Sequence, residues 1–123
     1  MTMTVRECYE KMGADYDDVM TRLRTDERVA KFLARVIGDP SFAMLDDAVA
    51  QKNAEEAFRA AHTIKGICGN LSLSQMGKSA SALTESLRGK TEFSEEALAL
   101  YAQVKADFNM SAECIAQIPS PQV

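Results

Sequence analysis

Apolar residues in two neighbouring segments of the chain recur at alternating spacings of four and three, the period of helices that pack along a common seam. In the first segment the seam residues are Ala57, Ala61, Ile64, Cys68 and Leu71. In the second they are Met76, Ala80, Leu83 and Leu87. Only three prolines occur in the 123 residues, so little interrupts such helices. These features predict an all-α fold, an antiparallel four-helix bundle with additional short N-terminal helices.

Helix-capping residues divide the chain into segments. The four main helices are predicted over about 39–51, 53–71, 73–88 and 94–117. Their predicted N-cap residues are Asp39, Asn53, Ser72 (in a capping box with Gln75) and Ser94. Shorter helical segments precede them over about 4–12 and 15–23 and from Thr25 to Gly38, and we expect these to cover one end or side of the bundle. We expect one domain over 1–118 and a flexible tail over 119–123.

Charge and composition exclude several classes of protein. The net charge is −4 and the pI is near 5.0, which argues against nucleic acid as the main partner. No apolar run approaches the roughly 18–20 residues that span a membrane, and we expect neither a signal peptide nor a membrane partner. Three cysteines without a paired motif predict reduced thiols in the cytoplasm, with Cys68 and Cys114 buried. The acidic runs 15–18 and 46–47 are expected to be solvated faces.

His62 is the single histidine of the chain, one step from the seam residue Ala61 and therefore at the border between core and solvent. Phe58, Arg59 and Lys65 are its neighbours on the same helical face. An imidazole nitrogen can act as a nucleophile near neutral pH. A phosphoryl group on that nitrogen would be negatively charged, and the two cations could attract or neutralise it.

Gly66 and Gly69 lie on the same face, inside a segment that otherwise favours helix. Each costs about 1 kcal/mol relative to alanine in a helix interior. The sequence leaves two explanations open. Either a group from another molecule must approach His62 closely, or a neighbouring helix of the same chain packs tightly there.

The stretch HTIKG, residues 62–66, resembles the HxxKG motif of histidine phosphotransfer (HPt) domains, the intermediates of multistep His-Asp phosphorelays. The longer stretch HTIKGICGNLSL and the upstream AFRAA are also similar to the family, and the resemblance covers about residues 15–117. It implies that His62 is the phosphoacceptor, that Lys65 stabilises the charge of the phosphoryl group, and that Gly66 leaves room for a receiver domain. Asn70 matches a family position near the helix end and is expected to be a structural cap.

Many family members carry a glutamine or other polar residue twenty-two positions after the histidine. Thr84 stands there in this chain, and Ser81 is the alternative one turn earlier for an orienting hydrogen bond to the imidazole. Phe58 and Ile67 are candidates for apolar contact with the receiver, although simple core packing is an equal alternative for Phe58. Arg59 and Gly69 complete the candidate binding residues.

The resemblance implies a phosphotransfer intermediate rather than an independent enzyme. His62 would accept a phosphoryl group from a receiver aspartate and pass it to another receiver. Expected partners are response-regulator receiver domains and a hybrid sensor histidine kinase. We expect no cofactor in this chain, Mg²⁺ on the receiver, no kinase activity and a monomer, either free-standing or excised from a longer protein.

Three other functions compete with this one. A non-catalytic adaptor of the same fold, which binds or titrates a receiver, remains the alternative. A purely structural bundle leaves the two glycines unexplained. A metal or haem site lacks ligands, because Cys68 lies about 240° further round the helix than His62.

Overall fold

The computed structural model describes residues 2–119, which form seven α-helices and no strand. Pro40–Ala50 (α4), Ala54–Leu71 (α5), Ser74–Leu87 (α6) and Glu95–Ala116 (α7) make the bundle, in which α5 and α6 are the most extensively packed pair. Val5–Met12 (α1), Tyr16–Leu23 (α2) and Asp26–Ile37 (α3) precede them. The predicted all-α bundle is therefore confirmed. The predicted tail lies, apart from Pro119, outside the described residues.

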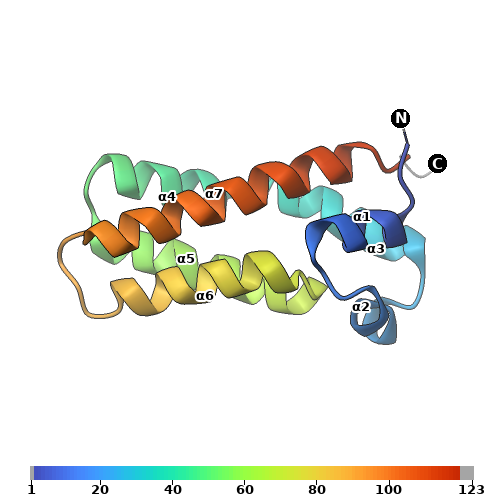
Figure 1. Ribbon diagram of the computed structural model, residues 1–123, viewed down its shortest axis with the longest axis horizontal. Helices are drawn as coiled ribbons and strands as arrows, with labels where there is room; N and C mark the ends of the chain where they lie inside the picture. The colour runs from blue at the N-terminus through green and yellow to red at the C-terminus, as the bar shows by residue number, and fades with distance from the viewer. Residues whose placement is uncertain (1, 120–123) are drawn as a thin grey trace.

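The N-terminal helices gather at one end of the bundle, where α5 turns into α6 (Figure 1). Hydrogen bonds join the two parts: the amide of Asp15 donates to the carbonyl of Ser72 at 2.9 Å, and the amide of Gln75 donates to the carbonyl of Gly13 at 3.2 Å. The buried hydroxyl of Tyr9 donates to the carbonyl of Leu71 at 2.8 Å. The prediction that these helices cover one end of the bundle is confirmed.

Most of the predicted caps are also confirmed. Side-chain oxygens of Thr25, Asp39, Asn53 and Ser94 each accept a hydrogen bond from a backbone amide of the first helical turn. In contrast, the capping box from Ser72 to Gln75 is wrong. Ser72 is the C-cap of α5, in the left-handed region with φ 56°, and Leu73 is the N-cap of α6, where no side chain caps the helix. The connection is so short that Ser72 must terminate one helix instead of starting the next.

Helices α5 and α6 approach each other closely at Gly77. A Cβ atom at that position would lie 3.2 Å from the Cβ of Cys68, which is tighter than ordinary van der Waals contact. All three cysteines are buried and free. Burial raises the pKa of both Cys8 and Cys68 to about 12, so these two thiols stay protonated and are poor nucleophiles.

The acidic runs are more than solvated faces, which corrects the expectation from sequence. Asp46 accepts a hydrogen bond from the Tyr101 hydroxyl at 2.6 Å and pairs with Lys105 at 2.8 Å, joining α4 to α7. Asp15 caps α2, and Asp18 pairs with Arg22 four residues on. Periodicity places such residues on a face but does not reveal which long side chains will reach them.

Over residues 2–119, none of the helices combines the length and the apolar character needed to cross a membrane.

Candidate functional site

The imidazole of His62 lies on the exposed face of α5, near the middle of the helix. Ala61 and Ile64, on the side of α5 that faces the core, are fully buried and fix the helix in place. The other residues predicted on this face are also exposed: Arg59, Lys65, Gly66 and Gly69. The structure therefore brings one imidazole, two cations and two glycines together on one accessible surface.

The two glycines face open space. A Cβ atom built at Gly66 or Gly69 would meet nothing within 4 Å. The explanation that a neighbouring helix packs tightly against them is therefore wrong, and that role belongs to Gly77. Within the described residues no contact requires glycine at either position, so approach by another molecule is the one of the two explanations that the structure does not contradict.

Phe58 is half-buried, packs against the core and stacks beside the imidazole. The ring centroids of Phe58 and His62 are 6.1 Å apart with an angle of 10° between their planes. The guanidinium carbon of Arg88, at the end of α6, lies 5.1 Å from the Phe58 centroid. Core packing of Phe58 is thus confirmed, and its ring also borders the exposed imidazole, while apolar contact with a receiver stays a prediction.

Glu85 brings a carboxylate to the same region, which sequence reasoning missed together with Arg88. Its two oxygens accept hydrogen bonds from Arg88 at 3.1 and 3.0 Å. These bonds and the charge of Arg88, followed by smaller effects of Lys65 and His62, hold the pKa of the Glu85 carboxyl below its usual value. No sequence spacing relates α5 to α6 in this way, because the antiparallel packing alone brings the end of α6 beside the middle of α5.

The two predicted cations differ in their surroundings. Arg59 pairs with Glu56 at 2.5 Å, one turn earlier on α5. Lys65 is exposed and forms no ion pair within residues 2–119. Lys65 is therefore the cation beside His62 whose charge remains available to an anion.

Thr84 does not belong to the exposed site. It is fully buried, and its hydroxyl donates to the carbonyl of Ala80 at 2.7 Å. Ser81 is half-buried, and across 2–119 no hydrogen bond joins either side chain to the imidazole. The orienting bond for which Thr84 and Ser81 were the candidates is thus absent, and position 84 faces the interior of the bundle.

Asn70 is exposed, and Ser72 rather than Asn70 is the C-cap of α5, so the expected capping role is wrong.

Ile67, on the same helix, is half-buried and lines a hollow between α3 and α5 with Phe32, which is 38% exposed. A second hollow, beside Phe58 and Arg59, flanks the other end of the face. His62 therefore lies between two shallow depressions.

Thr84→Val should leave phosphotransfer unchanged and alter the free energy of unfolding by no more than about 1.5 kcal/mol. The substitution keeps the volume, and the Ala80 carbonyl keeps its helical backbone partner. Thermal unfolding and transfer assays on the same preparation check both. A large loss of transfer in a folded variant would show that Thr84 acts on His62 after all.

Comparison with known protein families matches residues 38–115 to the Hpt domain. No curated protein and no solved structure matched the chain. Among residues 2–119, no group of three or more histidine, cysteine or acidic side chains is placed to hold a metal ion. The family match includes α4, α5, α6 and most of α7, and hence His62 and the whole exposed face of α5. The chain belongs to the Hpt domain family.

Proposed function

We propose that His62 accepts a phosphoryl group from the aspartate of one response-regulator receiver and passes it to another receiver in a two-component phosphorelay. Domains of this family act in histidine phosphotransfer and interact with receivers. The observation that carries the proposal for this chain is the exposed imidazole on a face where two helix-interior glycines meet nothing within 4 Å. An exposed and unobstructed surface around a nucleophile suits a reaction whose second reactant is another protein.

The proposed transfer is a single displacement at phosphorus. A lone pair of an imidazole nitrogen attacks, the new N–P bond forms, and the bond from phosphorus to the aspartyl oxygen breaks, so that the receiver recovers its carboxylate. The reverse displacement on a second receiver returns the free imidazole. Such reactions depend mainly on positioning and charge stabilisation. Lys65 contributes a positive charge, and the rigid bundle holds the nucleophile.

The receiver contributes the rest of the reaction centre in this proposal. It supplies the aspartate and the Mg²⁺, while this chain carries no cofactor and has no kinase activity of its own. A hybrid sensor histidine kinase is the proposed upstream source of phosphoryl groups, and the cytoplasm is the proposed compartment. The hollows beside Phe58 and Ile67 offer apolar contact on either side of His62.

The test is transfer of label from receivers charged with labelled acetyl phosphate in the presence of Mg²⁺. Label that appears on the protein and is labile to acid but stable to base supports a phosphohistidine. Receiver binding without label would point instead to the non-catalytic adaptor. Neither label nor binding, with receivers that serve other Hpt proteins in the same assay, would contradict the proposal.

Lys65→Met should lower kcat/KM for transfer about fivefold to tenfold, because it removes the unpaired charge beside the phosphoryl group. Arg59→Met is the matched control and should lower it less than about twofold, since Arg59 is already paired with Glu56. Single-turnover transfer at low ionic strength measures the difference, which salt should reduce. Equal effects of the two substitutions would argue against a special role for Lys65.

A further inference from the structure

The C-terminal part of α5 is weak by its own sequence. Gly66 and Gly69 fall within its last two turns, and its last turn contains no basic residue. Interior glycines destabilise a helix, and a helix C-terminus without a cation leaves its negative dipole end uncompensated. The glycines that leave the surface beside His62 open for docking therefore also weaken α5, the helix to which that surface belongs.

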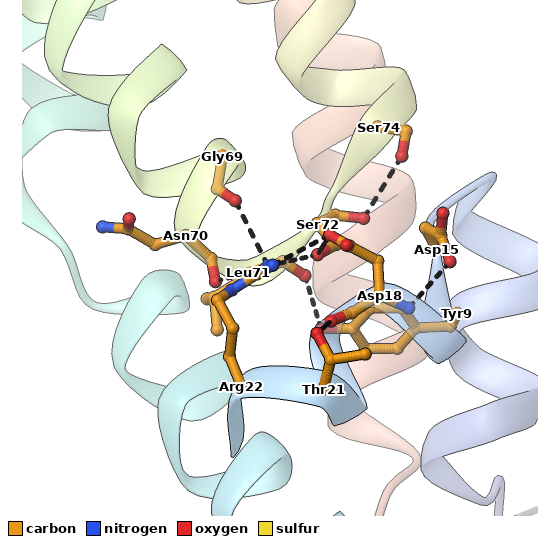
Figure 2. Close-up of polar contacts among 10 residues, drawn as sticks. All are labelled: Tyr9, Asp15, Asp18, Thr21, Arg22, Gly69, Asn70, Leu71, Ser72 and Ser74. Carbon is orange, nitrogen blue, oxygen red and sulfur yellow. Dashed lines mark hydrogen bonds and ion pairs between the residues drawn. The ribbon is translucent and has the colours of Figure 1, made fainter. Parts of the chain in front are cut away.

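Helix α2 provides what α5 lacks (Figure 2). One terminal nitrogen of Arg22 donates to the carbonyls of Asn70 at 3.1 Å and Gly69 at 3.5 Å, and to the hydroxyl of Ser72. The other terminal nitrogen pairs with Asp18 at 3.0 Å. The cation and donors that the end of α5 needs thus come from a helix some fifty residues earlier in the chain.

Ser72 connects the parts of this arrangement. Its hydroxyl accepts from Arg22 and donates to Asp18 at 2.6 Å, and the residue is 7% exposed. Hydrogen bonds from Ser72 and then Arg22 hold the pKa of the Asp18 carboxyl below its usual value. We call Asp18, Arg22 and Ser72 the α2 clasp.

The ion pair within the α2 clasp is exposed and by itself contributes little to stability. Its significance lies in geometry, because the carboxylate holds the guanidinium against the carbonyls of Gly69 and Asn70. The clasp does not touch His62, because even Gly69, whose carbonyl accepts from Arg22, lies seven residues or about 10 Å further along the helix at 1.5 Å per residue. It also lies partly outside the matched family domain, since α1, α2 and α3 precede residue 38.

We infer that Arg22, held by Asp18 and Ser72, is a positioning residue for phosphotransfer, because the α2 clasp keeps the glycine-containing half of α5 helical and its exposed face preformed for the receiver. The inference rests on the proposed function. Gly66 and Gly69 leave the surface without obstructing side chains but make α5 less stable as a helix. Contacts from α2 compensate for that loss of stability. A preformed surface binds its partner without an ordering cost at the moment of docking.

Arg22→Met should increase amide hydrogen exchange at residues 69–73 about tenfold, while exchange in α7 changes less than about twofold. Arg28→Met, an exposed arginine of α3 without an ion pair in the described part of the chain, is the matched control. In the double variant Arg22→Met/Gly69→Ala, exchange at residues 69–73 should be about fivefold slower than in Arg22→Met alone, because alanine favours the helix. Equal acceleration in every helix, or none at residues 69–73, would overturn the inference.

In transfer assays, Arg22→Met should raise KM for the receiver about fivefold to tenfold with kcat within about twofold, and Arg22→Lys should be intermediate because an ammonium cannot reach all the acceptors. A change in exchange with an unchanged KM would overturn the positioning role. Exchange is measured on the protein alone, so local protection by the clasp can be established even if the wild type accepts no phosphoryl group. That last result would reject the proposed function, and with it the positioning role, but not the clasp.

Discussion

We expect His62→Gln to abolish phosphoryl transfer, lowering label on the protein at least a thousandfold, and to leave the fold unaffected. Glutamine keeps a polar side chain at the position but has no nucleophilic nitrogen to form the N–P bond. The imidazole is exposed and makes no hydrogen bond within residues 2–119, so its loss removes little beyond the stack on Phe58. Surface changes of this kind usually alter the free energy of unfolding by no more than about 0.5 kcal/mol.

The matched control for this variant is Thr63→Ala, one residue along the same exposed helix. The hydroxyl of Thr63 donates to the carbonyl of Arg59 at 3.0 Å, so its removal leaves the imidazole untouched. Gel autoradiography after acid and base treatment, with thermal unfolding in parallel, gives both readouts. Label that persists on His62→Gln would place the phosphoryl group on another residue and reject the assignment of His62.

Local sequence pattern accounts for much of this fold and site. The seam that contains Ala61 and Ile64 orients α5 against the core, and with it exposes His62 one step away. Capping side chains such as Asn53 and Ser94 act within one turn, so they can be read from sequence. Both kinds of information depend only on neighbours along the helix.

The features that were missed depend on packing between distant segments. Ser72 has the right spacing to cap α6, but its hydroxyl instead bonds Arg22 and Asp18 on α2. Likewise, the antiparallel packing of α6 on α5 brings Arg88 over the ring of Phe58 and Glu85 close enough to sense the charge of His62. A pattern within one helix contains no information about which residues of another helix lie opposite.

Thr84 shows a different limit, one of resemblance. Its position after the histidine matches a polar position of the family, yet here the side chain is fully buried and bonds Ala80. Counting positions from the histidine identifies which residue corresponds to the family's polar position. It does not establish whether that side chain faces the imidazole or the core. The glycines are the opposite case, because the open space around Gly66 rules out one of the two explanations that the sequence leaves open.

Gly66→Gln should make the protein more stable and a worse phosphoryl acceptor. A side chain at Gly66 meets nothing of this chain within 4 Å, so it gains helix propensity without a clash. The expected gain is about 0.5–1 kcal/mol in the free energy of unfolding. The same side chain stands one turn from His62 on the docking face, and displacing the receiver by about 1 Å can lower the transfer rate about a hundredfold.

Ala102→Gln adds the same side chain at an exposed position of α7 and should leave transfer unchanged, whereas Gly66→Ala should fall between wild type and Gly66→Gln. Thermal unfolding and single-turnover transfer separate the two effects, because they are predicted to have opposite signs. A variant that is more stable and still transfers normally would mean that receivers do not approach over Gly66. A variant that loses both stability and transfer would indicate damage to the helix rather than blocked access. The smaller Gly66→Ala would then decide, since a methyl group has nothing in the chain to disturb.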